Sequence, residues 1–214
     1  MNNNIKKDFN RLMENQIESI LQSNLEKRPS LLLHACCAPC SSAVLEKLTK
    51  YFEIAIFYYN PNIHPESEYI RRRDELKDFI SNFSIAKNIK IIIDSYNPEE
   101  YFIATNVRHE IELQTEKERG ERCFRCYKFR MEKAFEYAIK NKFEYVTTTL
   151  SISPHKDASK INFIGAELEK LNKSETKFLY SDFKKKNGFK RSLEISSEFG
   201  LYRQDYCGCI FSKI

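Results

Sequence analysis

The hydrophobic positions of the chain follow two alternating patterns, which predict strands separated by helices. Short apolar runs, some rich in β-branched residues, predict buried strands at 30–35, 51–61, 89–96, 143–153 and, more briefly, 176–183. Apolar residues that recur at helical spacing predict amphipathic helices at 1–28, 41–48, 64–83, 98–117, around 129–138, 155–172 and 191–200. Strands that alternate with helices favour a parallel sheet covered by helices on both faces.

The length of the chain suits one domain that spans residues 1–214. Neither an internal repeat nor a low-complexity linker divides it. No apolar run approaches the roughly 20 residues of a membrane span, and the N-terminus lacks the apolar segment of a signal peptide. We therefore expect a cytoplasmic protein without a membrane partner, in which the part after about residue 98 adds helical and cysteine-bearing elements to an α/β domain.

Overall charge does not identify a partner. The formal net charge is only +5, and many enzymes that never bind nucleic acid carry as much. Three local basic runs, at 69–77, 121–130 and 183–191, are more informative, because each neighbours a cysteine motif or a predicted active-site loop. Each run has two interpretations: a solvated face, or a surface that contacts RNA phosphates.

The seven cysteines form three tight groups, CCxxC at 36–40, CxxC at 123–126 and CxC at 207–209, and none lies elsewhere. An odd number of thiols in a cytoplasmic chain of this size argues against a disulfide framework. Cysteines that merely filled the core would be scattered. Closely spaced thiols point instead to metal ligation or redox chemistry.

The first cysteine group occupies a position where α/β folds bind ligands. It directly follows the first predicted strand and precedes a helix for which Ser41 or Ser42 can serve as N-cap. In doubly wound sheets the crevice at the carboxyl ends of the strands holds the ligand. The positive end of the following helix favours anions and lowers thiol pKa values, and thiolates are the species that bind metals.

The number of thiols suggests two metal centres. A structural zinc site takes four thiolate or imidazole ligands, so seven cysteines exceed one such site and fall short of two. One four-cysteine cluster and one three-cysteine metal with an open position would use all seven. Two zinc sites and thiol–disulfide chemistry are the alternatives that this count leaves open.

Five segments together resemble the QueH family of epoxyqueuosine reductases: LLLHACCAPCSSAVLEKL, YYNPNIHPESEYIRRRDELK, ERGERCFRCYKFRME, TTTLSISPHKD and LYRQDYCGCIFS. The combination of CCAPC, CxxC and YCGC in this order is specific, and the segments extend from residue 31 to residue 212. The resemblance implies a HUP or Rossmann-like fold related to PP-loop ATP pyrophosphatases, a three-layer α/β domain with a parallel sheet. The cysteine loop then stands where those proteins bind phosphate, which argues against ATP as a substrate.

The resemblance also implies an activity and its cofactors. Members of this family reduce the epoxide of epoxyqueuosine, at the wobble position of the tRNA anticodon, to the alkene in the last step of queuosine synthesis. They carry a [4Fe–4S] cluster and a neighbouring mononuclear iron. The partners implied are tRNA and an external electron donor.

By motif position, the resemblance assigns Cys36, Cys37, Cys123 and Cys126 to the cluster and Cys40, Cys207 and Cys209 to the second iron. The adjacent pair poses a geometric condition. Neighbouring side chains of an extended segment point to opposite faces. Cys36 and Cys37 therefore reach one metal site only if the chain turns there, as it should where a helix begins.

Reduction of an epoxide to an alkene takes two electrons, releases the oxygen as water and needs a proton donor. The implied cluster would supply electrons singly, and the open-site iron would act as a Lewis acid on the epoxide oxygen. Candidate donors beside the cysteines are His34, Asp205 and Tyr206, with His64, His155 and Asp157 on neighbouring loops. His34 also suits a buried hydrogen-bonding role, and Asp205 and Tyr206 could merely orient the CxC segment.

Basic and aromatic side chains would deliver the anticodon nucleotide, because single-stranded RNA is bound through its phosphates and its stacked bases. The candidate phosphate contacts are Arg71, Arg72, Arg73, Lys184, Lys185, Lys186, Lys190 and Arg191. The candidate stacking residues, for which a core role is the alternative, are Tyr58, Tyr59, Phe124 and Tyr127.

Two other functions compete with a reductase. A PP-loop-like iron–sulfur enzyme of tRNA thiolation would share the fold and the charge, but it should show a Ser- and Gly-rich phosphate loop where this chain has HACCAPCSS. A zinc-stabilised RNA-binding module would need neither an open metal position nor a redox centre.

Overall fold

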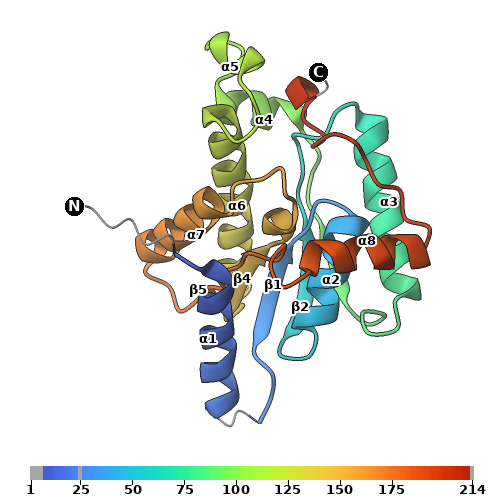
Figure 1. The fold of residues 1–214 in the computed structure, drawn as a ribbon. Helices are drawn as coiled ribbons and strands as arrows, with labels where there is room; N and C mark the ends of the chain where they lie inside the picture. Colours follow the sequence, from blue (N-terminus) through green and yellow to red (C-terminus); the bar gives the residue numbers. More distant parts are fainter. Residues whose placement is uncertain (1–6, 24–25, 213–214) are drawn as a thin grey trace.

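The structure is a computed structural model that describes residues 7–23 and 26–212 (Figure 1). Its helices (the 3₁₀ helices labelled η) and strands are α1 (Phe9–Gln22), β1 (Ser30–His34), α2 (Ala38–Leu48), β2 (Glu53–Tyr58), α3 (Glu66–Asn82), β3 (Lys90–Ile93), α4 (Pro98–Thr105), α5 (Glu112–Thr115), α6 (Glu121–Lys140), β4 (Tyr145–Thr148), η1 (Thr149–Ile152), α7 (Ala158–Asn172), β5 (Lys177–Phe178), α8 (Gly188–Glu198) and η2 (Ile210–Ser212). Every predicted strand is present, and each is shorter than its apolar run. Parts of the predicted first helix, at 1–6 and 24–25, lie outside the described residues.

The strands form one parallel sheet in the order β3-β2-β1-β4-β5. In the centre, residues 31–34 of β1 pair with 54–57 of β2 on one side and with 145–148 of β4 on the other. Because the chain order reverses at β1, the boundary between β1 and β4 is the switch point at which such sheets bind ligands. The predicted parallel α/β sheet is confirmed.

Alternate residues of β1 pack into the two halves of the core, one on each face of the sheet. Leu31 and Leu33 face a layer built from α1, α2, α3 and α8, whereas Leu32 faces a layer built from α6 and α7. All three leucines are fully buried, as a strand covered on both faces requires. The predicted three-layer arrangement therefore holds. Within the described residues, no helix has the combination of length and apolar character that would let it cross a membrane.

The helix after the cysteine loop begins earlier than the sequence predicts. Its N-cap is Cys37, and α2 starts at Ala38, because Pro39 has the fixed φ that suits the first turn of a helix. The prediction of Ser41 or Ser42 as N-cap was wrong. Their hydroxyls instead donate to the carbonyls of Cys37 at 2.8 Å and Pro39 at 2.9 Å. Cys40 consequently lies in the first turn of the helix, and Cys36 directly precedes the N-cap.

The predicted helix over 98–117 is interrupted. α4 ends at Thr105, and its C-cap Asn106 adopts the left-handed conformation with φ 55°; the short α5 follows as a separate turn. Asn tolerates this conformation better than other residues with a side chain. The next helix, α6, begins at Glu121, so that Cys123 and Cys126 lie in its first two turns.

Candidate metal and substrate site

A cavity of about 290 Å³ opens where β1 and β4 end. Its walls come from the cysteine loop after β1, from η1 and the 153–156 loop after β4, and from the C-terminal segment 203–207. The cavity is therefore at the switch point of the sheet, and its size suits one small ligand.

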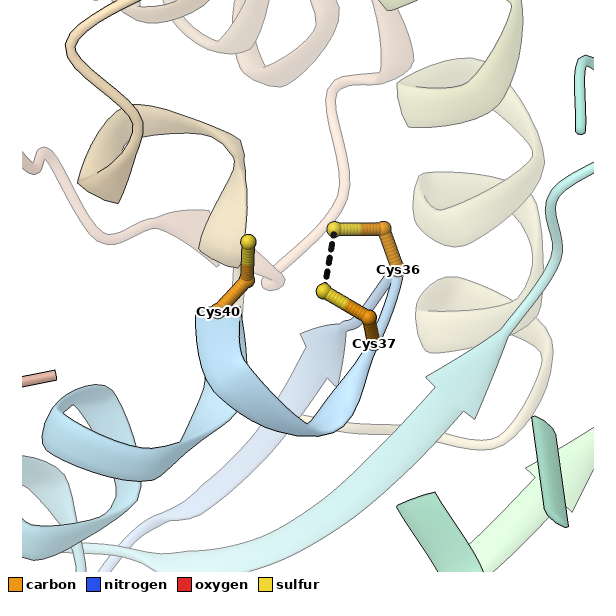
Figure 2. A group of neighbouring side chains, drawn as sticks. All are labelled: Cys36, Cys37 and Cys40. Atoms are coloured by element: carbon orange, nitrogen blue, oxygen red, sulfur yellow. Dashed lines mark hydrogen bonds between the residues drawn. The ribbon is translucent and has the colours of Figure 1, made fainter. Parts of the chain in front are cut away.

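The three loop thiols converge on one point at the edge of this cavity (Figure 2). The sulfur atoms of Cys36, Cys37 and Cys40 all lie within 4.8 Å of one another, and those of Cys36 and Cys37 are 3.8 Å apart. The turn into α2 brings the adjacent pair to the same side, as the geometric condition required. A group of thiols at this separation can bind a metal ion.

The three loop thiols influence one another's ionisation. Hydrogen bonds from Cys37 and Cys40 hold the pKa of Cys36 well below its ordinary value. The same contact with Cys36 raises the pKa of Cys37 to about 12 and raises that of Cys40. A metal ion bound here would favour the thiolate form of all three.

The other four cysteines line a second, much smaller cavity of about 10 Å³: Cys123, Cys126, Cys207 and Cys209. Burial is the main cause that raises the pKa of Cys126 to about 12 and that of Cys209 to about 11. The hydroxyl of Tyr101 lies 2.9 Å from the Cys209 sulfur. Cys207 lines both cavities, so the two thiol groups adjoin each other.

Long-range hydrogen bonds hold the CxC segment, which has no regular structure of its own. The His64 backbone N–H donates to the Gly208 carbonyl at 2.8 Å, and the Tyr206 hydroxyl donates to the His64 carbonyl at 2.7 Å. The Arg72 guanidinium donates to the carbonyls of Cys207 at 3.2 Å and Tyr206 at 3.4 Å. We call these contacts the C-terminal clamp.

A buried cation lies between the two thiol groups. Arg130 follows Cys126 by one turn of α6, is 1% exposed, and donates to the side-chain oxygen of Asn60. Asn60 in turn donates to the carbonyl of Ala35 at 2.9 Å, directly before the cysteine loop. Burial lowers the pKa of Arg130, but the charges of Cys126 and Cys36 outweigh it and raise the pKa. Arg130 thus compensates thiolate charge on both sides.

The predicted proton donors are placed differently from one another. Asp205, Tyr206 and His155 line the larger cavity. His34 does not: it is fully buried, and its ring nitrogens contact the Thr148 hydroxyl at 2.8 Å and the Tyr59 carbonyl at 3.1 Å. Burial lowers the pKa of His34 to about 3. A neutral imidazole with both nitrogens bonded fits the buried hydrogen-bonding role that is the alternative for His34.

Two other predicted donors are used structurally. The Asp157 carboxylate caps α7 by accepting the backbone N–H groups of Ser159 at 2.8 Å and Lys160 at 3.2 Å. The ring of His64 packs against Phe102, and its backbone belongs to the C-terminal clamp.

The candidate phosphate contacts divide into buried, paired and exposed side chains. Arg72 is 1% exposed and paired with Glu68 at 2.6 Å, so its burial argues against the predicted contact with RNA phosphates. Arg71 stacks on the Tyr202 ring, and Arg73 pairs with its neighbour Asp74. Arg191 pairs with three glutamates. Lys184, Lys185 and Lys186 line an open groove, and Lys190 is exposed.

The candidate stacking residues are mainly core residues. Tyr58, Tyr59 and Tyr127 are almost fully buried, and only Phe124, half-buried beside Phe163, is partly accessible. Their burial supports the alternative, a role in the core.

Sequence reasoning missed three side chains that touch the site. Lys156 lines the larger cavity and lies inside the motif that provided His155 and Asp157. Arg130 follows the CxxC motif by one helical turn. Gln204 donates to the Cys37 sulfur at 3.0 Å, across 167 positions of sequence. All three lie within quoted motifs, but no local signal connects Gln204 to the cysteine loop.

Comparison with known proteins identifies the family. The family model described as epoxyqueuosine reductase QueH matches residues 31–214. The chain belongs to the QueH family. It is 39% identical over 214 residues to the epoxyqueuosine reductase QueH of Streptococcus pyogenes serotype M1, which covers 99% of this chain and 80% of that one. It is 38% identical to the Staphylococcus aureus protein of the same name, over 87% of this chain and 77% of that one.

A more distant relative extends the same match. The epoxyqueuosine reductase QueH of Thermotoga maritima is 34% identical over 191 residues, which are 86% of this chain and 91% of that one. The family places this chain among oxidoreductases of tRNA queuosine processing. The thiol groups of the QueH fold described above are consistent with a metal cofactor in such an enzyme.

Proposed function

We propose that the protein reduces the epoxide of epoxyqueuosine in tRNA to the alkene of queuosine. The observation that carries the proposal is the grouping of three thiols beside a cavity of about 290 Å³ at the switch point of the sheet, in a chain of the QueH family. These thiols stand at the position where a PP-loop enzyme would have its phosphate-binding loop. An enzyme with this substrate acts in the cytoplasm, where tRNA is found.

The proposed cofactors are a [4Fe–4S] cluster and one further iron. The donor set suits a metal cofactor, because three sulfur atoms within 4.8 Å of one another can together bind a cation. The proposed ligand sets are Cys36, Cys37, Cys123 and Cys126 for the cluster and Cys40, Cys207 and Cys209 for the second iron. These sets draw on both thiol groups, and the position of Cys207 beside both cavities supports an assembly that spans them.

The reaction consumes two electrons and two protons, breaks both carbon–oxygen bonds of the epoxide, forms the alkene and releases water. When bound, the cluster would supply the electrons singly and the second iron would polarise the epoxide oxygen. The electrons come from an external reductant.

The walls of the cavity supply the remaining functions. Asp205, Tyr206 and His155 line the cavity and can pass protons to the departing oxygen. The Tyr206 hydroxyl is held by the His64 carbonyl, which fixes the orientation of its ring. Burial lowers the pKa of the Lys156 ammonium, but the charges of Cys207, Cys36 and Cys40 outweigh it and raise the pKa. Lys156 therefore stays charged and offsets thiolate charge in the wall.

The proposal is tested with protein purified without air and tRNA that contains epoxyqueuosine. Incubation with a chemical reductant should convert the modified nucleoside to queuosine, detected as the loss of one oxygen atom in its mass. Cys36→Ser should abolish the conversion, whereas a serine at a distant surface position, Lys87→Ser, should retain it. Unchanged nucleoside with iron-loaded protein would contradict the proposal.

Cys40 gives the sharpest test of the ligand sets. If Cys40 binds the second iron, Cys40→Ser should lower iron by about one atom per chain and leave acid-labile sulfide unchanged. A parallel loss of sulfide would place Cys40 on the cluster and reject the proposed partition.

A further inference from the structure

A second, larger depression adjoins the cavity. This groove, of about 730 Å³, lies between the start of α1, the 154–159 loop and the 182–186 loop. We call it the basic groove. Pro154 and Lys156 line both the groove and the cavity, so a chain that leaves the cavity past the 154–159 loop enters the groove directly.

The basic groove carries a surplus of positive charge. Six basic and three acidic side chains line it. The three acidic side chains are already occupied: Asp8 and Asp157 accept backbone N–H groups at the starts of α1 and α7, and Asp182 pairs with Lys184. With six basic side chains against these three carboxylates, the lining of the groove keeps a net positive charge.

The cations of the groove differ in whether they have acidic partners. Among the described residues, neither Lys156 nor the exposed Lys185 has an acidic partner within salt-bridge distance. The exposed Arg119 donates to the Pro154 carbonyl. Lys186, in contrast, is paired with Glu14 at 2.7 Å.

We propose that the basic groove binds phosphates of the single-stranded RNA next to the nucleotide that occupies the cavity. This inference rests on the proposed function and specifies how its substrate is held. Exposed lysines on loops act as point charges for phosphate oxygens. The order of contacts then runs from the modified nucleotide in the cavity, past Lys156, to flanking phosphates at Lys185 and Arg119.

The experiment measures RNA binding separately from reduction. A fluorescent RNA hairpin with an anticodon-loop sequence and no modified base is titrated with the metal-loaded protein over a series of salt concentrations. Lys185→Gln should weaken binding roughly five- to tenfold at low salt and lower the slope of log affinity against log salt by about 0.7, the value for one lost contact with a single strand. Adding Arg119→Gln should lower the slope by about 0.7 again.

The matched control is Lys87→Gln. Lys87 is exposed, and no acidic side chain of the described residues lies within salt-bridge distance of it. It lies between α3 and β3, at the opposite end of the sheet. It should leave affinity and slope unchanged. Equal effects of Lys185→Gln and Lys87→Gln, or no effect of either, would overturn the groove proposal. A fully paired RNA duplex that binds as tightly as the hairpin would overturn the assignment to single-stranded RNA.

The two proposals fail separately. If the protein reduces epoxyqueuosine but the groove variants bind the hairpin normally, only the groove proposal fails. If the groove variants lose RNA binding but the metal-loaded protein reduces no epoxide, the proposed reaction fails while the RNA-binding groove stands.

Discussion

The two thiol groups of this protein are positioned by different means. Cys36 directly precedes α2, Cys37 is its N-cap and Cys40 lies in its first turn, so the local backbone brings their sulfurs together. Cys207 and Cys209 lie in a segment without regular structure, held by the C-terminal clamp to residues more than 130 positions away in sequence. The first group depends on secondary structure, and the second depends on tertiary contacts.

This difference predicts where the site is vulnerable. Substitutions in the cysteine loop at 36–40 should disturb its thiols little, because the helix and the sheet independently fix the conformation of the loop. Changes in the clamp should release Cys207 and Cys209 and leave the loop thiols in place. Four substitutions test this contrast, in decreasing order of expected effect.

Arg72→Met should have the largest effect. It removes the donor to two carbonyls and leaves Glu68, its buried partner at 2.6 Å, without compensation, which costs about 3–5 kcal/mol. Chemical unfolding measures the loss. Lys77→Met, on the exposed face of the same helix, is the control and should change stability by less than about 0.5 kcal/mol. Similar losses in both variants would reject a special role of Arg72.

Gly208→Ala should disturb the CxC segment directly. Gly208 has φ 100°, and a Cβ there would lie 2.9 Å from Ile63 and 3.0 Å from Arg72, so strain of about 1–3 kcal/mol is expected. The rate of alkylation of Cys207 and Cys209, read by mass spectrometry in metal-free protein, should rise. Gly200→Ala has a positive φ but open space around its Cβ, so it should leave both rates unchanged. Equal rates in the two variants would contradict the clamp.

Pro39→Ala should have a smaller effect, since it tests the locally determined group. The residue occupies the first turn of α2, where its fixed φ mainly restricts the unfolded chain, so its loss should cost only about 0.4–1 kcal/mol. Alkylation of Cys36, Cys37 and Cys40 should stay unchanged. If Pro39→Ala accelerated alkylation of the loop cysteines as much as Gly208→Ala accelerates that of Cys207, the loop would be no more robust than the clamp.

Arg191→Ala should have the smallest effect. Arg191 joins α8 to Glu46 of α2 at 2.8 Å, and partly exposed pairs of this kind contribute about 0–1 kcal/mol. Hydrogen bonding from Arg191 holds the pKa of Glu46 below its ordinary value. The pair therefore stabilises the fold above the unfolded carboxyl pKa of about 4.3, and this contribution disappears as the pH falls through the lowered folded value. In the variant, the free energy of unfolding should depend slightly less on pH in the acid range, and binding of the RNA hairpin should be unchanged. Weakened RNA binding would support Arg191 as a phosphate contact.

Local patterns allowed prediction of the sheet and of the loop group. The apolar runs located the strands, and the turn between strand and helix explained how Cys36 and Cys37 could share one site. Contacts across the fold could not be read in this way. The burial of Arg72, the bond from Gln204 to Cys37 and the role of Asn60 in holding Arg130 all depend on which elements the fold brings together. For this reason the basic run at 69–77 alone does not reveal that Arg72, unlike its neighbours, is buried.

Iron, acid-labile sulfide and zinc, counted together in protein purified without air, test the central claim that the seven thiols hold one cluster and one further iron. The account predicts about five irons and four sulfides per chain, with little zinc. One or two zinc ions without sulfide would contradict it, because the thiol groups would then be structural and the proposed reduction would have no source of electrons in the site.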